Sequence, residues 1–201
     1  MKLPHKIVMA SSNVGKTKEI SALLAHLDVV VVPQSEFGVS AADETGSTFE
    51  ENAVIKAQHA SAATGLPAIA DDSGLCVDAL DGRPGVWSAR YAGDDATDDD
   101  NIDKLLGDLD GVRDEDRDAE FLCVACFVYS ADAEPLFATG RWRGRILNTR
   151  RGNGGFGYDP VFFDPTTGKA AAELSADEKN SRSHRGMALR ALADLLGATP
   201  A

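Results

Sequence analysis

The sequence predicts an α/β fold, in which a mixed β-sheet is flanked by helices, with residues 1–201 forming a single compact domain. Short apolar segments alternate along the chain with segments that have the apolar spacing of a helix. Two long neighbouring β-segments, joined by "SADAEP", indicate an antiparallel hairpin or meander that could form a lobe. The chain has 201 residues, 43% of them hydrophobic, which is enough for the core of one domain.

In chain order, strands are expected at 6–11, 28–33, 67–71, 75–79, 119–130, 135–146 and 160–163. Helices are expected at 15–26, 48–64, 97–108 and 182–196. The second helix has the clearest ends. Thr48 and Glu51 have the spacing of a capping box, and Gly65 followed by Pro67 ends the helix.

The charge pattern excludes some classes of partner. A formal net charge of −12 argues against nucleic-acid binding. The acidic segment 94–118 does not match a calcium-binding loop and is predicted to be solvated surface, whereas the charges of 140–155 are all basic and could attract a small anion. No apolar run approaches the roughly 20 residues of a membrane span. The apolar run at 7–10 is too short for a signal peptide, so we expect a cytoplasmic protein with no membrane partner.

The cysteines are predicted to be core residues. Cys123 and Cys126 form a C-x-x-C pattern inside "EFLCVACFVYS", which alternates like a buried strand. Residues i and i+3 of a strand point to opposite faces, so the two thiols could not share a metal ion. The chain has three cysteines, and this odd number argues against a disulfide framework.

The stretch "SSNVGKTKEI", residues 11–20, resembles the end of a phosphate-binding P-loop. Gly15-Lys16-Thr17 matches the pattern, but Ala10 stands where the P-loop has its first glycine, so the strict motif fails. What remains is a strand end followed by a helix start that carries a lysine. Helix starts attract anions, and a lysine there opposes the helix dipole unless an anion bridges them. The alternative is an ordinary capped helix start exposed to solvent.

The glycines of "RGNGGFGYDP" formally match the dinucleotide-binding pattern G-x-G-x-x-G, but no helix follows them, so we reject that interpretation. Phe156 and Tyr158 beside these glycines could stack on a flat ring. The alternative is a glycine-rich turn whose aromatic rings fold into the core.

Two acidic residues, Asp71 and Asp72, end a predicted strand before Ser73-Gly74 turns the chain. Their side chains diverge in an extended chain, so one can face a site while the other is bound within the fold. Carboxylate oxygens suit Mg²⁺, and a carboxylate beside the metal could accept a proton from water. Glu44 is a further candidate acid. The alternative is that Asp-Asp-Ser-Gly is simply a common turn sequence.

Basic residues crowd the segment "SADEKNSRSHRGMAL", which leads into the last predicted helix. Lys179, Arg182, His184 and Arg185 at such a junction are well placed to bind phosphate or base oxygens. The alternative is solvated surface charge.

Five blocks in one order resemble the inosine triphosphate pyrophosphatase family, the dITP/XTP pyrophosphatases that remove non-standard purine nucleotides. The resemblance runs from residue 6 to about residue 190 and rests on SSNVGKTKE, ETGSTFEENAVIKA, ADDSGL with GRPGVWSARYAG, GGFGYDPVFF and ELSADEKNSRSHRG. It implies an elongated mixed sheet with two lobes, a central cleft that holds the site, and a homodimer. The implied reaction is Mg²⁺-dependent hydrolysis of ITP, dITP or XTP to the monophosphate and pyrophosphate, which keeps these nucleotides out of nucleic acids.

The same resemblance assigns residue roles. Asp72 matches the proton acceptor and metal ligand, and Glu44 is the second candidate metal ligand. Phe156 would stack on the base. The remaining substrate contacts are Ser11, Ser12, Asn13, Val14, Gly15 and Lys16 in the triphosphate-binding turn, Lys56, Ser73, the base-binding Gly157, Tyr158 and Asp159, and Lys179, His184 and Arg185. Ser12 and Tyr158 depart mildly from the family, in which many members have glycine and some have tryptophan at these positions.

Selectivity for hypoxanthine and xanthine would come from donors aimed at the 6-keto oxygen, because the amino group of adenine would leave a buried donor unpaired at a cost of roughly 1–3 kcal/mol. This does not explain how guanine is rejected. Two other functions remain open: an NTPase of the P-loop type, which would release orthophosphate, and a nucleotide-binding module without turnover.

Overall fold

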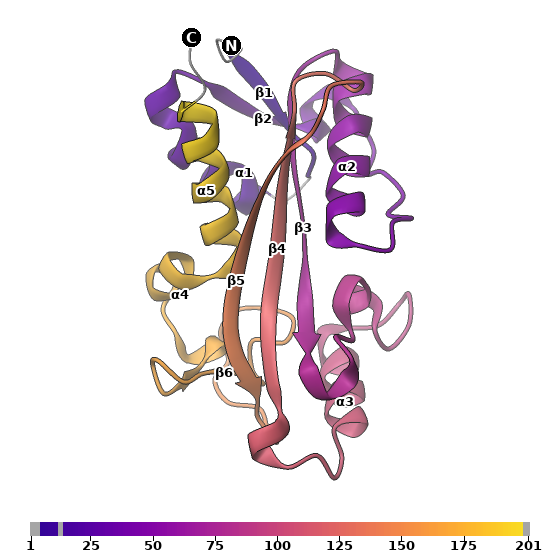
Figure 1. The fold of residues 1–201 in the computed structure, drawn as a ribbon, viewed down its shortest axis with the longest axis vertical. Helices are drawn as coiled ribbons and strands as arrows, with labels where there is room; N and C mark the ends of the chain where they lie inside the picture. Colours follow the sequence, from indigo (N-terminus) through magenta and orange to yellow (C-terminus); the bar gives the residue numbers. More distant parts are fainter. Residues whose placement is uncertain (1–4, 12–13, 199–201) are drawn as a thin grey trace. The chain divides into compact units, whose positions relative to one another are not determined.

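The computed structural model describes residues 5–11 and 14–198 and consists of a seven-stranded sheet with helices packed against it (Figure 1). The strands are β1 (Lys6–Met9), β2 (Val30–Pro33), β3 (Ala68–Val77), β4 (Asp118–Val128), β5 (Leu136–Ile146), β6 (Phe162–Asp164) and β7 (Lys169–Ala170). The helices are α1 (Val14–Leu24), α2 (Phe49–Thr64), α3 (Asp98–Asp108), α4 (Ala176–Arg182) and α5 (His184–Ala198), together with short 3₁₀ turns.

The sheet has the strand order β2-β1-β3-β4-β5-β6-β7. Strand β1 runs parallel to β2 and β3, whereas β6 is antiparallel to β5 and β7. Strands β4 and β5 are neighbours in the sheet and run in opposite directions, as the sequence predicts (Figure 1). The predicted fold class, a mixed sheet flanked by helices, is therefore confirmed.

The chain divides into two compact units. Unit 1 contains Met1–Asp72, Cys123–Gly140 and Arg185–Ala201. Unit 2 contains Ser73–Leu122 and Arg141–His184. Strands β3, β4 and β5 each continue from one unit into the other, so the chain crosses the boundary within regular strands. That the whole chain folds as one domain stays a prediction.

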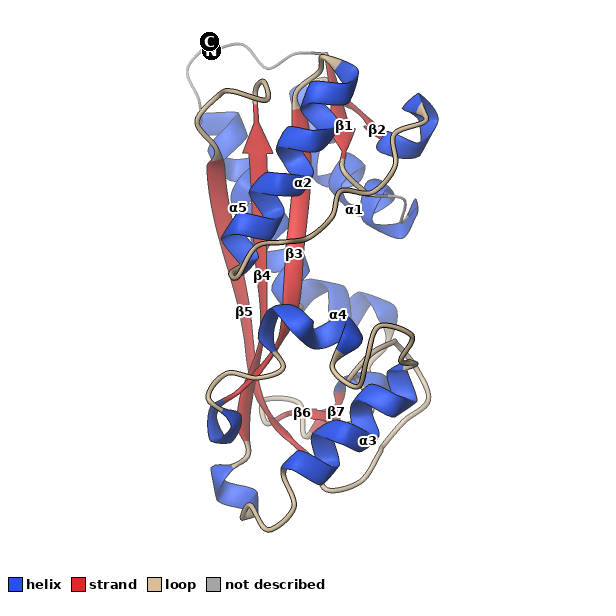
Figure 2. Ribbon diagram, turned by 90° about the vertical axis from the view of Figure 1, so that its right-hand side faces the viewer, coloured by secondary structure: helices blue, strands red, loops and turns tan. Residues whose placement is uncertain are grey.

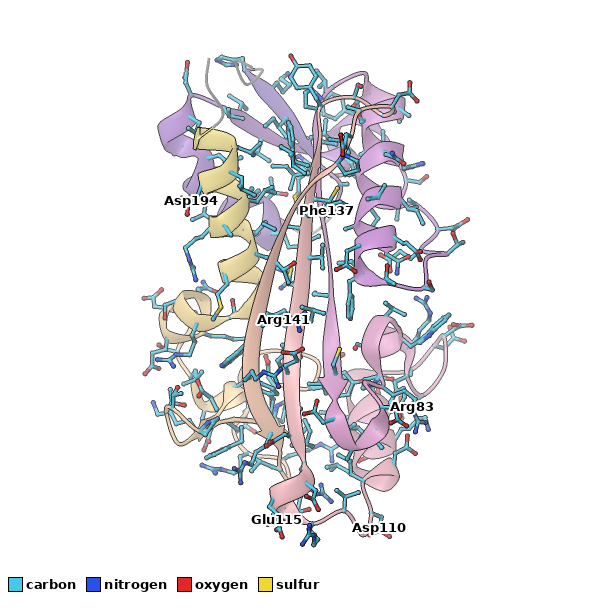
Figure 3. All side chains as sticks on the ribbon, in the orientation of Figure 1. Arg83, Asp110, Glu115, Phe137, Arg141 and Asp194 are labelled. Carbon is cyan, nitrogen blue, oxygen red and sulfur yellow. The ribbon has the colours of Figure 1, made fainter. Side chains whose placement is uncertain are left out.

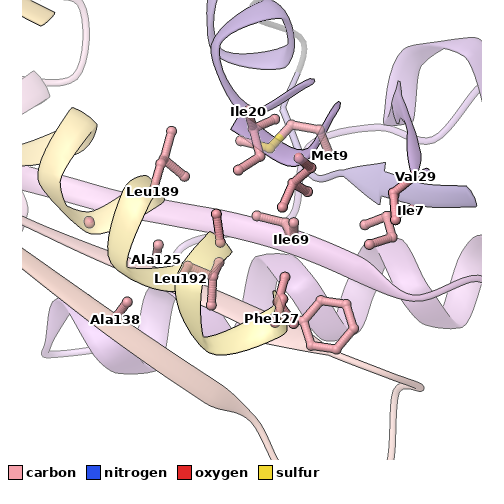
Figure 4. Packing of buried hydrophobic residues seen from close by; sticks show 14 of the residues in the cluster. Ile7, Met9, Ile20, Val29, Ile69, Ala125, Phe127, Ala138, Leu189 and Leu192 are labelled. Carbon is pink, nitrogen blue, oxygen red and sulfur yellow. The ribbon is translucent and has the colours of Figure 1, made fainter. Parts of the chain in front are cut away.

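In unit 1, helices α2 and α5 pack on opposite faces of the strands (Figures 1 and 2). On the α5 side, Leu189 and Leu192 join Ile69 and Phe127 in one buried apolar cluster (Figure 4). Burying one such side chain stabilises the fold by roughly 1.5–3 kcal/mol. Helix α2 is buried through alanines, Ala53, Ala57 and Ala60, which have no exposed surface. Such small side chains let the backbone of α2 approach the sheet closely.

The core of unit 2 is aromatic. The ring of Phe162 lies 4.5 Å from that of Phe121 and 5.1 Å from that of Trp142. Strand β5 alternates here between buried Trp142 and exposed arginines, and Arg141 pairs with Glu120 of β4 (Figure 3). This alternation is the period of a strand with one face in the core.

Several predicted details are confirmed. Thr48 caps α2 by accepting a 3.1 Å bond from the Glu51 amide, and Gly65 ends the helix in a left-handed conformation. The Glu51 carboxylate bonds to Ser47 instead of completing the capping box. The two C-x-x-C cysteines of β4 are buried, as expected of core residues. No helix in the described part of the chain is long and apolar enough to span a membrane.

Two predicted boundaries are wrong. Ser73 and Gly74 do not turn the chain, because β3 is one continuous strand with β1 and β4 as its neighbours in the sheet. A Ser-Gly pair permits a turn, but hydrogen bonds in the middle of a sheet keep it extended. The helix predicted at 182–196 corresponds to α5, which begins two residues later, at His184. The short helix α4 before it was not predicted, and the two are separated at Ser183, where ψ is 147°.

Candidate active site

Asp71 and Asp72 are consecutive residues of β3, and their side chains bind separate groups of unit 1, as the period of a strand predicts. Asp71 is bound by the Lys16 ammonium, which lies 2.9 Å and 2.8 Å from its two carboxylate oxygens. The Arg185 Nε donates a third bond of 3.2 Å. Burial opposes the ionisation of Asp71, but Lys16 and Arg185 outweigh it and hold the pKa of Asp71 well below its ordinary value. This carboxylate is therefore a permanent anion between two cations.

Lys16 reaches Asp71 from the first turn of α1. The sequence raised the question of which anion offsets a lysine at this helix start, and in the structure the Asp71 carboxylate does so. Arg185 is the second residue of α5 and meets the same carboxylate. Two cations from different helices therefore share one buried carboxylate here.

Asp72 has the opposite balance of charge. The Lys56 ammonium lies 2.8 Å from one Asp72 oxygen and 2.7 Å from a Glu44 oxygen, so one lysine serves two carboxylates. Burial raises the pKa of Asp72 above its ordinary value; Lys56 opposes this effect and Glu44 adds to it. Burial also disfavours the charged form of Lys56, but Asp72 and Glu44 outweigh it and raise the pKa of Lys56. The lysine therefore stays charged beside a carboxylate that is easier to protonate than usual.

Helix α2 and the loop before it position this second group. Asn52, one turn before Lys56, donates a 3.3 Å bond to Asp72 and accepts a 2.8 Å bond from the Gly46 amide. A Cβ added at Gly46 would lie 2.7 Å from the Asn52 side-chain oxygen, so this approach requires glycine. The contact fixes the loop that carries Glu44. Sequence analysis missed Asn52, although its i,i+4 spacing from Lys56 could have placed both on one helix face.

The donor set around Asp72 fits Mg²⁺. Among the described residues, no group of three or more histidine, cysteine, aspartate and glutamate side chains is placed to hold a metal ion. Mg²⁺ does not need such a group, because it is usually held by one or two carboxylates together with water and substrate phosphates. Asp72 and Glu44 offer two carboxylates that already share one cation.

In unit 2, Phe156 presents an exposed ring beside a charged pair. The residue is 63% exposed, and the Lys179 ammonium lies 4.6 Å from the centroid of its ring. Lys179 pairs with buried Asp159, which also accepts a 2.9 Å bond from the Phe156 amide. A Cβ added at Gly155 would lie 1.9 Å from the Asp159 carboxylate, so a glycine is needed there. Asp159 thereby fixes both Phe156 and Lys179.

The other predicted residues of unit 2 lie in different surroundings. Tyr158 is buried in the aromatic core, and its hydroxyl donates a 2.9 Å bond to the Ser88 carbonyl. His184 stacks on Phe121 with ring centroids 4.8 Å apart. The Gly157 amide donates a 2.6 Å bond to Asp98. Ser73 lies on β3 and is half-buried.

Of the residues assigned to the triphosphate-binding turn, Ser11 follows β1, and Val14, Gly15 and Lys16 form the first turn of α1. Ser12 and Asn13 lie outside the described residues. The structure therefore brings Lys16, Glu44, Lys56, Asp72 and Arg185 into two neighbouring charge groups of unit 1, and Phe156, Asp159 and Lys179 into one group of unit 2.

Comparison with known proteins gives a consistent answer. The Ham1 family model matches residues 7–195. The chain belongs to the Ham1 family. This confirms the resemblance that the five sequence blocks carry.

Relatives and solved structures extend the match over nearly the full chain. A dITP/XTP pyrophosphatase of Pectobacterium atrosepticum is 54% identical over 96% of this chain and 98% of its own length. The dITP/XTP pyrophosphatase of Methylococcus capsulatus is 57% identical over 96% of this chain and 97% of its own length. The HAM1 protein structure from Coxiella burnetii has a TM-score of 0.92 at 49% identity and covers 96% of this chain and 98% of its own. The structure of the Ham1 protein of Staphylococcus aureus has a TM-score of 0.90 at 41% identity and covers 97% of this chain and 100% of its own.

The structure also shows contacts of Asp71 that the five sequence blocks do not predict. Asp71 carries no role in the resemblance, yet it is the residue that joins Lys16 to Arg185. Its signal in the sequence was only its place beside Asp72.

Proposed function

We propose that the chain is a Mg²⁺-dependent pyrophosphohydrolase that converts ITP, dITP and XTP to the monophosphate and pyrophosphate. Family membership and relatives above half identity make it a nucleoside triphosphate pyrophosphatase. The observation that carries the proposed mechanism is the charge arrangement on β3, where a carboxylate with a raised pKa adjoins a carboxylate bound by two cations.

Asp72 is the proposed proton acceptor. A carboxylate is a better base when its pKa is raised, and burial raises the pKa of Asp72. The oxygen of water attacks the α phosphorus as its proton passes to Asp72. The bond from the α phosphorus to the bridging oxygen breaks, and pyrophosphate leaves with the electron pair. Lys56 keeps Asp72 oriented by its 2.8 Å contact.

Lys16 and Arg185 are proposed to bind the phosphate chain, because these two cations, at the starts of α1 and α5, meet at one carboxylate beside Asp72. Fixed cations aimed at phosphate oxygens stabilise the charge of the transition state and of the leaving group. Mg²⁺, held by Asp72 and Glu44, would supply further neutralisation of phosphate charge.

The proposed site for the purine ring is Phe156. Stacking of a base on an aromatic side chain is worth about 1–3 kcal/mol. Lys179 is a charged donor beside the same ring, and it would favour a keto oxygen over the amino group of adenine. This supports selection of 6-keto purines and leaves the rejection of guanine to other contacts.

A product assay tests the proposal. Purified protein with Mg²⁺ is given ITP, dITP, XTP, GTP and ATP in turn, and pyrophosphate and orthophosphate are scored separately, with a parallel series in EDTA. We expect pyrophosphate from ITP, dITP and XTP, little product from ATP or GTP, and loss of turnover in EDTA. Orthophosphate as the product would instead indicate an NTPase, and tight binding without turnover would indicate a binding module.

We also propose that the protein works as a cytoplasmic homodimer, as the family resemblance implies. Light scattering after size-exclusion chromatography tests the oligomer: the expected mass is twice the 21.2 kDa of one chain. A mass of one chain at micromolar concentration would contradict the dimer.

A further inference from the structure

We propose that Arg182 is a positioning residue that anchors the C-terminal end of α4 to buried Asp164 and so holds Lys179 beside Phe156. This inference rests on the proposed function, because it assigns Lys179 and Phe156 to nucleotide binding. Arg182 itself is a positioning residue because, in the structure, it contacts Asp164 and Thr166. All of these residues belong to unit 2.

Helix α4 is too short to be stable by itself. It has 7 residues, and isolated helices shorter than about 12 residues are marginal in water. Its N-terminal end is held by a capping box in which the Ser175 hydroxyl and the Glu178 carboxylate exchange bonds with each other's amides. Both residues are exposed. Glu178 also pairs with Lys169 of β7 at 3.5 Å, but both side chains are exposed and such a pair contributes little. The buried contact of the helix lies at its other end.

At the C-terminal end of α4, Arg182 binds the Asp164 carboxylate, which other donors already hold in place. Its Nη1 donates to an Asp164 oxygen at 3.2 Å and to the Thr166 hydroxyl at 3.0 Å. The Asp164 side chain is 1% exposed and is held by the Trp142 indole at 3.2 Å and by the Thr166 amide at 2.8 Å. Burial of Asp164 opposes its ionisation, but the bonds from Thr166 and Trp142 and the charge of Arg182 outweigh it and lower the pKa of this carboxylate. Asp164 is thus a fixed anion, and Arg182 is its cation.

Lys179 lies three residues before Arg182, so the two side chains emerge from the same side of the helix. The Ser183 amide bonds to the Lys179 carbonyl at 2.7 Å and closes the turn that joins them. One side of α4 is therefore held by two ion pairs, Lys179 with Asp159 and Arg182 with Asp164. If the contact of Arg182 with Asp164 is lost, the last turn of α4 can fray, and Lys179 loses its fixed direction over the Phe156 ring.

The Arg182 side chain has one donor that is not satisfied. Its Nε is buried and has no hydrogen-bond partner in the described structure. An unpaired buried donor is unfavourable. The contacts of Arg182 with the rest of the unit are therefore those of its Nη1, which set the direction of the helix.

The test compares Arg182→Gln with the conservative Arg182→Lys and with Arg150→Gln. Arg150 is an exposed-surface arginine of the same unit that pairs with Asp103 at 2.9 Å, so its replacement removes the same charge without touching α4. For Arg182→Gln we expect the KM for ITP to rise about 5- to 10-fold while kcat stays within about twofold, since the lost bond orders the helix without touching the reacting atoms. Arg182→Lys should recover part of the KM, and Arg150→Gln should leave both constants unchanged.

Amide hydrogen exchange gives a readout that does not depend on turnover. The amides of 179–183 should exchange at least about tenfold faster in Arg182→Gln than in the wild type, with the protection of β4 and β5 unchanged. Asp164→Asn should raise KM to a similar extent, and the double variant should show no larger increase than either single variant, because both act on one contact.

The outcomes separate the two claims. Wild-type protein that releases no pyrophosphate from ITP or XTP overturns the proposed function. Unchanged exchange at 179–183 in Arg182→Gln overturns the anchoring role. Faster exchange with an unchanged KM shows that the position of α4 does not matter for the nucleotide, and that result also overturns the inference.

Discussion

Unit 1 and unit 2 each contain a buried aspartate paired with a lysine, but the balance of charge around the two pairs differs. In unit 2, Asp159 and Lys179 form a one-to-one pair. In unit 1, Lys56 is shared by Asp72 and Glu44, so negative charge is in excess. In the neighbouring group, two cations, Lys16 and Arg185, bind the one carboxylate of Asp71.

This difference indicates what each unit can do. A balanced pair fixes geometry, and in unit 2 it fixes an exposed aromatic ring. A group with unequal numbers of cationic and anionic side chains attracts a ligand of the opposite charge. The group at Asp72 would attract a metal ion or a proton, and the group at Asp71 would attract phosphate. We therefore expect the same residue types to serve chemistry in unit 1 and positioning in unit 2.

The largest expected effect is that of Asp72→Asn. If Asp72 accepts the proton of water, kcat should fall by about 10²–10⁴-fold. The melting temperature should stay equal or rise slightly, because burial makes the ionised Asp72 unfavourable in the folded state. Rates of pyrophosphate release and thermal unfolding measure both. The exposed residue Asp110 provides a matched control, since Asp110→Asn removes the same charge (Figure 3). A near wild-type kcat in Asp72→Asn would remove Asp72 from the reaction.

The second effect concerns the cations that bind Asp71. Lys16→Ala should mainly raise KM, by roughly 10- to 100-fold, because a charge-assisted hydrogen bond contributes about 1.5–3 kcal/mol. Steady-state kinetics with ITP measures it. Lys18→Ala removes an exposed lysine from the same helix and should leave KM unchanged. Equal KM values for the Lys16 variant and the wild type would exclude Lys16 from the phosphate site.

The third effect tests the stacking of the base on Phe156 in unit 2. Phe156→Ala should raise the KM for ITP by roughly 5- to 50-fold, since base stacking is worth about 1–3 kcal/mol. The melting temperature should hardly change, because Phe156 is 63% exposed. Phe156→Tyr keeps an aromatic ring and should keep most of the affinity. If the alanine variant binds ITP as tightly as the wild type, the base does not stack on Phe156.

The smallest effect is one of pH on stability. The folded-state pKa of Asp71 lies below its unfolded value of about 3.9, so its ionic contacts stabilise the fold above that pH and are lost as pH falls toward the folded-state pKa. The free energy of unfolding of wild type should therefore exceed that of Asp71→Asn at pH 7, and the gap should narrow below about pH 4. Urea titrations at pH 7, 5 and 3.5 measure it. A gap that is constant over this range would show that the ionised form of Asp71 does not contribute.

The predictable features were those set by local physics. The period of a strand predicted that Asp71 and Asp72 would diverge, and Thr48 and Gly65 predicted the ends of α2. The turn at Ser73 was wrong because pairing with neighbouring strands, which the local sequence does not contain, keeps that residue extended.

The partners of the site residues could not be predicted, because they are distant in the chain. Lys16 meets Asp71 across 55 positions, and Arg185 meets it across 114. The sequence showed a lysine at a helix start and a run of basic residues, and the fold joins both to one carboxylate. Helix α4 was missed for a related reason, since its seven residues are held by tertiary contacts rather than by apolar periodicity.

Hydrolysis of ITP in H₂¹⁸O, followed by mass spectrometry of both products, tests directly whether water attacks the α phosphorus. Attack there places one ¹⁸O in the nucleoside monophosphate and none in the pyrophosphate, and this is the result we expect. Label in the pyrophosphate would mean attack on the β phosphorus, and label in orthophosphate would mean cleavage at the γ phosphorus; either result would exclude the proposed reaction.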